Sequence, residues 1–237
     1  MRRIGFSSGA LAYSDFRRGV SMLYGKGIHA VELSALRQAE LRPLMQGLGD
    51  LELSQFRYIS VHAPSQVRAE DEQEIIRLLA PLSSRRWPII LHPDAAHDLL
   101  LWREFGDLLC IENMDRRKPT GRTARELLSV FEQLPEASFC FDIGHARQVD
   151  TTMTEAYLML KEFGSRLRQV HVSEVNTRSK HDRLSYASLL AFREVADLIP
   201  EDVPLILETP VLEAQIETEI LRVLEALPVP EQARAPR

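Results

Sequence analysis

Short apolar runs recur along the chain, and most of them end in a histidine, a glutamate or an aspartate. A run of four or five apolar, β-branched or aromatic residues is typical of a β-strand that is buried on both faces. Six runs have this form, at residues 59–62, 89–92, 109–112, 139–142, 169–171 and 205–208. They predict strands that deliver polar, ligand-type side chains to one end of a shared scaffold.

Two further apolar runs, at residues 3–7 and 29–33, complete a series of eight predicted strands. Amphipathic helical patterns lie between them, at 71–82, 123–134, 154–163 and 188–199, with a closing helix at 218–227 and a stunted one near 95–105. Strict alternation of strand and helix predicts a parallel sheet with right-handed crossovers. Eight such units predict an α/β fold, a closed (β/α)₈ TIM barrel with its active site at the carboxyl ends of the strands.

The sequence predicts one barrel domain over residues 1–227 and a flexible tail over 228–237, which is rich in proline, alanine and charge. No Gly-x-Gly-x-x-Gly motif follows a predicted strand, so the residues give no dinucleotide-binding fingerprint. The segment Gly25-Lys26-Gly27 precedes a strand and lacks the third glycine.

The composition of the 237 residues, 45% hydrophobic and 27% charged, suits one domain with a full core. A net charge of −5 gives no overall sign of nucleic-acid binding, although a basic face can exist locally. Cys110 and Cys140 lie within predicted strands and are expected to pack as buried apolar groups. With no Cys-x-x-Cys motif, no signal-peptide pattern and no long apolar span, we expect a cytoplasmic protein without membrane contact.

The polar residues at the strand ends predict a metal site. Seven of them share one mouth of the barrel: Glu32, His62, His92, Glu112, Asp142, His171 and Glu208. His145 and His181 lie in loops on the same face, whereas His29 and His97, the latter on a predicted helix, are expected to be structural or surface residues. Because so many buried carboxylates and imidazoles are costly without compensation, we expect one to three divalent ions. Mixed nitrogen and oxygen ligands favour Zn²⁺, Mn²⁺, Fe²⁺ or Co²⁺.

Glu32 is the least secure of these ligands, because a carboxylate at its position could simply pair with a loop arginine.

The strand-end phrases together resemble the xylose isomerase-like TIM barrel superfamily, which includes sugar isomerases, epimerases and abasic-site nucleases of the endonuclease IV type. The phrases that carry the resemblance are Val61-His62-Ala63-Pro64, Leu91-His92-Pro93, Ile111-Glu112-Asn113-Met114, Phe141-Asp142-Ile143-Gly144-His145, Val170-His171-Val172 and Leu207-Glu208-Thr209-Pro210.

The resemblance implies roles for these residues. Four of them would hold the metal common to the isomerases: Glu112, Asp142, His171 and Glu208. In the nuclease branch, His62 and His92 would hold a second metal bridged by Glu112, and His145 and His181 would help to hold a third. The nuclease motif Asp-x-His is here Ser179-Lys180-His181, which weakens that third site, and Asp182 or Glu174 could replace the lost ligand. Glu174 could equally pair with Arg178.

Two enzymatic functions fit this pattern, and a third interpretation is a barrel that has kept its ligands but lost catalysis. The first is a metal-dependent isomerase or epimerase of a sugar or sugar phosphate, in which Glu112 and Glu208 move a proton through an enediolate, His145 orients a hydroxyl group, and basic loops receive a phosphate. The alternative is an endonuclease IV-like phosphodiesterase that cleaves DNA at abasic or damaged sites. The short chain and the acidic total charge favour the isomerase, and the pair His62 and His92 favours the nuclease. The same basic residues serve either hypothesis: Arg116, Arg117, Lys118, Arg178, Lys180 and Arg183.

Overall fold

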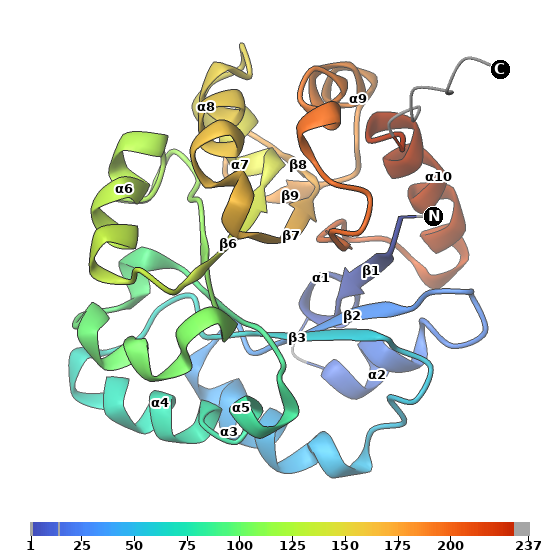
Figure 1. The fold of residues 1–237 in the computed structure, drawn as a ribbon. Coiled ribbons are helices and arrows are strands. Elements are labelled where there is room, and N and C mark those ends of the chain that lie inside the picture. Colours follow the sequence, from blue (N-terminus) through green and yellow to red (C-terminus); the bar gives the residue numbers. More distant parts are fainter. Residues whose placement is uncertain (1, 14, 230–237) are drawn as a thin grey trace, which may run out of the picture.

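The eight predicted strands form a closed parallel barrel in the computed structural model, which describes residues 2–13 and 15–229 (Figure 1). The order around the barrel is β1-β10-β7-β6-β5-β4-β3-β2. The strands are β1 (Ile4–Ser7), β2 (Ala30–Ser34), β3 (Tyr58–His62), β4 (Ile89–Leu91), β5 (Leu109–Glu112), β6 (Ser138–Asp142), β7 (Leu167–Val172) and β10 (Leu205–Leu207). The predicted TIM barrel is therefore confirmed.

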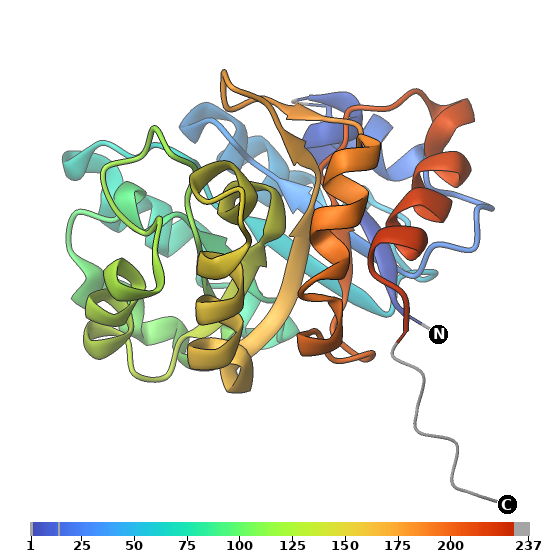
Figure 2. The same ribbon diagram turned by 90° about the horizontal axis from the view of Figure 1, so that it is seen from above.

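Helices surround the barrel. They are α1 (Ser8–Ala12), α2 (Phe16–Ser21), α3 (Gln38–Gly47), α4 (Glu72–Leu79), α5 (Leu82–Arg85), α6 (Ala124–Gln133), α7 (Ile143–Val149), α8 (Thr154–Phe163), α9 (Tyr186–Arg193) and α10 (Ile216–Ala226). Thr123 caps α6 by accepting the Glu126 N–H, but the Glu126 carboxylate binds the N–H of Arg122 and so completes no reciprocal capping box. A small antiparallel pair, β8 (Glu174–Val175) and β9 (His181–Asp182), rises beyond the carboxyl end of β7 (Figure 2).

The short unit between β4 and β5 holds 3₁₀ helix rather than α-helix, from Leu99 to Leu108, with a kink at Gly106. This agrees with the stunted helix expected there. His97 lies before that segment, in a bend, so its placement on a helix is wrong. Its structural role is supported, because its imidazole ring contacts the Val67 carbonyl and its backbone N–H donates to the buried Glu72 carboxylate.

Each strand of the barrel presents different chemistry on its two faces. The outward side chains, such as Val61, Ile111 and Phe141, belong to the large apolar core between the barrel and its helices. The alternate positions point into the barrel, and there Ile90, Cys110 and Cys140 form a separate small apolar cluster. Both cysteines are buried and free, as predicted. Most inward positions nearer the carboxyl ends are polar, so the apolar core lies outside the barrel and the ligand-type residues lie inside it.

Gly5 allows the barrel to close between β1 and β2, because a Cβ at this position would lie 2.3 Å from the Ala30 carbonyl oxygen. The tail predicted over residues 228–237 lies, from residue 230 onward, outside the described residues. Within the described part of the chain, no helix has both the length and the apolar character that crossing a bilayer requires.

Candidate metal centre

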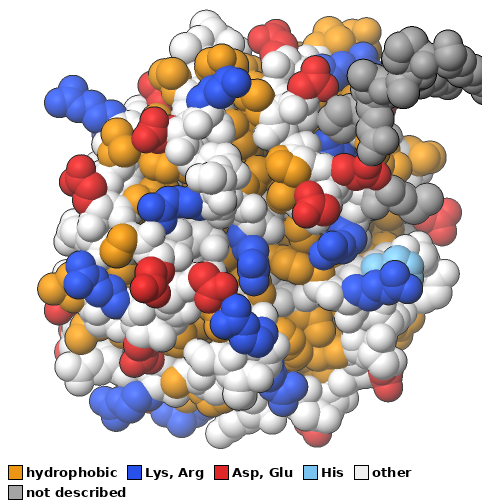
Figure 3. Space-filling model, in the orientation of Figure 1, with side chains coloured by type: hydrophobic (Ala, Val, Ile, Leu, Met, Phe, Trp, Pro, Cys, Tyr) orange, Lys and Arg blue, Asp and Glu red, His pale blue; other side chains and the backbone are white. Residues whose placement is uncertain are grey.

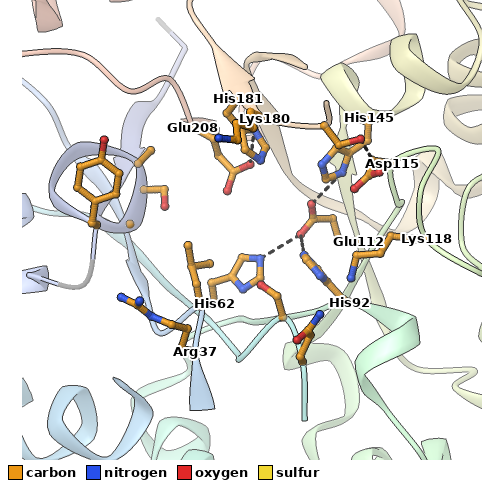
Figure 4. A pocket seen from close by; sticks show the side chains of 18 of the residues that line it. Arg37, His62, His92, Glu112, Asp115, Lys118, His145, Lys180, His181 and Glu208 are labelled. Atoms are coloured by element: carbon orange, nitrogen blue, oxygen red, sulfur yellow. Dashed lines mark hydrogen bonds and ion pairs between the residues drawn. The ribbon is translucent and has the colours of Figure 1, made fainter. Parts of the chain in front are cut away.

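A cavity of about 790 Å³ opens at the carboxyl ends of the strands, on the face opposite to the one seen in Figure 1. The view into it in Figure 4 shows imidazole and carboxylate side chains from several strands converging on Glu112. Among the described residues, several overlapping groups here have ligand atoms within 4.8 Å of one another. Three of them concern the predicted sites: His62–His92–Glu112, Glu112–Asp142–His171–Glu208 and Asp142–His145–His181.

The first group places two imidazoles on one carboxylate oxygen. The Nε2 atoms of His62 and His92 lie 3.2 and 3.3 Å from Glu112 Oε2. His62 donates its Nδ1–H to the Ala63 carbonyl at 2.6 Å, and that bond leaves an Nε2 lone pair directed at the carboxylate. Two lone pairs that face each other need a proton or a metal ion between them. The arrangement therefore suits a cation held by all three side chains.

The second group contains buried atoms that lack hydrogen bonds. Asp142 Oδ2 and His171 Nδ1 are both buried and have no hydrogen-bond partner among the described residues. His171 Nδ1 lies 3.5 Å from Glu112 and 3.7 Å from Glu208, distances typical of atoms that share an ion rather than a hydrogen bond. Unsatisfied buried polar atoms are costly, and a divalent cation would satisfy both. The residues of this group therefore fit a metal ion.

Glu32 supports this group from inside the barrel instead of lying at the mouth. Its Oε2 accepts the Nε2–H of His171 at 2.9 Å and a hydrogen bond from Gln169 at 2.7 Å. No loop arginine of the described chain pairs with it, so the expected alternative partner is wrong. The bond to Glu32 fixes the His171 ring with its Nδ1 lone pair toward the cavity, as carboxylate–histidine–metal arrangements do.

The third group differs from the nuclease pattern at the substituted position. His145 contacts the Asn113 carbonyl at 3.0 Å, and His181 Nδ1 contacts Ser173 Oγ at 2.7 Å. Ser179, which stands in place of the nuclease aspartate, donates to Asp115 at 2.8 Å. Asp115, which the sequence pattern did not indicate, thereby supplies a buried carboxylate close to this side of the cavity.

Neither proposed replacement for the missing aspartate faces the cavity. Asp182 is exposed and accepts from Asn176 at 2.6 Å. Glu174 accepts hydrogen bonds from Ser185 and Ser188, and Arg147 lies 3.9 Å away. The expected pairing of Glu174 with Arg178 is therefore wrong, because the two serines at the start of α9 take up its carboxylate.

Burial and the neighbouring charges shift the pKa values of the histidines in the centre. Burial lowers the pKa of His62, but the hydrogen bond to Glu112 and the charge of Glu32 outweigh it and raise that pKa to about 9. In the same way Asp142 and Glu112 overcome burial and raise the pKa of His145 to about 10. Burial dominates at His92 and His181, whose pKa values fall to about 4. The centre thus holds excess negative charge that protons or cations must balance.

The basic residues divide between the cavity and other contacts. Arg117, Lys118 and Lys180 line the cavity. Arg116 and Arg178 do not line it, and Arg183 forms an ion pair with the buried Glu219 at 3.0 Å. The structure therefore does not place these three residues in the lining of the cavity.

Two further residues line the cavity although the sequence pattern did not indicate them: Arg37 after β2, and Tyr13, whose side chain is 78% exposed. Only the position of Asp115, three residues past Glu112 in the same loop, could have marked it as a candidate.

The fold resembles three solved structures over nearly their whole lengths. Endonuclease IV from Thermus thermophilus matches with a TM-score of 0.61 at 20% identity, covering 94% of this chain and 99% of that one. A xylose isomerase domain protein from Alicyclobacillus acidocaldarius matches with a TM-score of 0.63 at 14% identity, covering 94% and 99%. A xylose isomerase-like TIM barrel protein from Mycobacterium smegmatis, in complex with magnesium, matches with a TM-score of 0.59 at 12% identity, covering 96% and 98%.

No family model and no curated protein matches the chain. Identities of 12 to 20% establish the fold and leave the activity open. The fold of the chain is therefore that of the xylose isomerase-like TIM barrels, as its strand-end phrases indicated.

Proposed function

We propose that the chain is a divalent-metal-dependent phosphodiesterase that cleaves DNA at abasic or otherwise damaged sites. The observation that carries this proposal is the position of Glu112, which belongs both to the group with His62 and His92 and to the group with Asp142, His171 and Glu208. A carboxylate shared by two adjacent ligand groups is suited to a pair of cations about 3.5–4 Å apart, the arrangement that phosphatases and nucleases use. An isomerase of the kind considered above would need only the second group.

Bound cations would polarise a phosphate group and lower the pKa of a water molecule at the cavity floor. The chain's own residues would position the substrate. Arg117 and Lys118 lie at the rim, and a guanidinium or ammonium group there can bind the non-bridging oxygens of a phosphate. Lys118 is held at 2.8 Å by Asp94, which fixes its position at the edge of the cavity.

A proton relay is available on the opposite side of the cavity. Glu208 Oε2 lies 3.5 Å from His181 Nδ1, and both residues line the cavity. Burial raises the pKa of Glu208 and lowers the pKa of His181, which brings the proton affinities of the two groups closer together and so favours transfer of a proton between them. This pair is placed to protonate a leaving oxygen.

One observation favours the isomerase or epimerase as a second candidate. Glu112 and Glu208 lie 3.5 and 3.7 Å from the same atom, His171 Nδ1, so one ligand group contains two carboxylates that could move a proton across a sugar carbon. The serine at position 179 also leaves the third group without the carboxylate of the nuclease motif. This candidate requires one ion and no contribution from His92.

The variant His92→Gln separates the two functions, because His92 belongs only to the first group. The unmodified chain should bind at least two ions and incise a duplex oligonucleotide with one abasic site, and incision should weaken as salt rises. His92→Gln should lose about one ion per chain and its incision activity. Metal content by elemental mass spectrometry and cleavage on denaturing gels measure both.

His29→Gln is the matched control, since His29 is exposed on the other face of the barrel and should leave metal content and incision unchanged. One ion per chain, no incision and solvent deuterium exchange into an aldose or ketose would instead establish the second candidate. Retention of full incision by His92→Gln would remove the shared-carboxylate argument.

A further inference from the structure

A second cavity, of about 470 Å³, lies at the other end of the barrel, where the strands begin. Figure 3 shows this face, with Lys and Arg side chains around hydrophobic surface near its middle. Its charged lining residues are Arg3, Arg57, Arg85, Arg86, Arg168 and Asp202. Five of them are arginines, in a chain whose net charge is −5.

The arginines meet here because each stands where a strand starts. Arg3 directly precedes β1, Arg57 directly precedes β3, and Arg168 is the second residue of β7. Arg85 ends α5, and Arg86 follows it, three residues before β4. Since parallel strands of a barrel begin on one rim, basic residues at these positions converge on the same opening.

Most of these cations have no acidic partner. Arg3, Arg57 and Arg168 form no ion pair with any described carboxylate, and Arg85 lies over the Trp87 ring at 5.0 Å. Among these five arginines, Arg86 is the one with an acidic partner in the described part of the chain, Asp107 at 3.0 Å. Asp202 is the one carboxylate among the lining residues, so the five guanidinium groups leave an excess of positive charge in the cavity, and a bound anion would offset their repulsion.

The shape and the donors define the anion. The volume lies within the range of small-molecule pockets, about 300–1,000 Å³. Guanidinium groups bind phosphate oxygens through paired N–H bonds, and several of them around one hollow suit more than one phosphate group. Tyr58 closes the inner end, because its hydroxyl donates to Gln169 inside the barrel at 2.7 Å. A nucleic-acid backbone would require an extended groove rather than a compact hollow.

We propose that this arginine-lined cavity binds a small molecule that carries two or more phosphate groups. The site is separate from the metal centre, which lies at the opposite end of the barrel, and it does not depend on the reaction that the metal centre performs. Inorganic pyrophosphate is the simplest probe of this chemistry.

Calorimetric titration of pyrophosphate into the protein without added metal ions tests the proposal, because pyrophosphate would otherwise bind divalent cations at the metal centre. Binding should weaken about tenfold or more in Arg57→Met and in Arg168→Met, since each loses a hydrogen bond to a charged group. Arg168→Lys keeps the charge but loses the paired donors, so its affinity should fall between that of the unmodified chain and that of Arg168→Met. Melting curves identify any variant that fails to fold, and the exposed Arg57 provides the result if the half-buried Arg168 is needed for folding.

Two control variants locate the binding. Arg17→Met removes an exposed arginine that pairs with Asp50 elsewhere on the surface, and it should bind pyrophosphate as the unmodified chain does. Lys118→Met, at the metal centre, should leave unchanged the binding step that the arginine variants remove, even where it weakens a separate binding step at the metal centre. Loss of affinity in Lys118→Met with full affinity in the arginine variants would place the anion at the metal centre and overturn the proposal. Absence of binding at millimolar pyrophosphate, or displacement of pyrophosphate from this cavity by duplex DNA, would overturn it as well.

Discussion

Glu32 is a buried residue that orients His171, although the two lie 139 residues apart in the sequence. Its carboxylate accepts the Nε2–H of His171 at 2.9 Å, and neither side chain is exposed. The substitution Glu32→Gln keeps the size and removes the charge, so the charge-assisted bond becomes a weaker neutral one. Loss of a partner that orients a metal-binding histidine lowers metal affinity about 10- to 100-fold, or about 1.4–2.7 kcal/mol. We expect Glu32→Gln to fall within this range.

Metal affinity can be measured by competition with a chromophoric chelator, without reference to any reaction. Ser60→Ala is the control, because Ser60 donates to the same carboxylate at 3.3 Å but does not contact His171. It should change metal affinity less than threefold, about 0.6 kcal/mol. Equal affinities for Glu32→Gln and the unmodified chain would refute the orienting role, and equal losses in both variants would assign the effect to disturbed packing.

The remaining predictions concern protons, ions and packing. Metal affinity should rise with pH from 6 to about 9, because His62 and His145, with pKa values near 9 and 10, hold protons that a cation must displace. Calorimetry in buffers of different ionisation enthalpy measures the number of protons released on metal binding. A metal affinity that does not change with pH would contradict this prediction. Chelation of bound ions should lower the melting temperature, and an unchanged one would show that the ligand groups are satisfied without ions. Gly5→Ala should cost about 1–3 kcal/mol in urea unfolding, because its Cβ would meet the Ala30 carbonyl; Gly49→Ala, with open space around it, should cost less than about 0.5 kcal/mol.

The fold and the position of the inward polar residues could be predicted because both depend on local pattern. An apolar run that ends in Glu112 or Asp142 identifies a strand and its polar end without knowledge of any partner. In a parallel barrel all such ends meet at one mouth, so the regularity of the spacing was enough to bring His62 and Glu208 together.

The supporting contacts could not be predicted, because they depend on pairings across the barrel. Nothing in the neighbourhood of Glu32 indicates that it meets His171 and not a solvent-exposed arginine. Arg183 was expected at the site because its loop is basic, but the buried Glu219 on α10 takes up its charge. Asp115 was missed because its partner, Ser179, comes from a distant loop. Which hydrogen-bond or ion-pair partner a side chain takes depends on the groups that the fold brings close to it, and the sequence alone does not show which of them is near enough.

The two faces of each barrel strand have separate roles: the outward side chains pack against the helices, and the inward side chains carry most of the polar groups. Outward residues such as Val61 and Phe141 bind the helices to the barrel, and their inward neighbours His62 and Asp142 contribute nothing to that apolar contact. A substitution at an inward position can therefore exchange one metal, or one reaction, for another while the outer layer keeps its packing. Substitutions can accumulate at the inward positions of a strand while its outward positions stay the same. One barrel scaffold can in this way support different reactions.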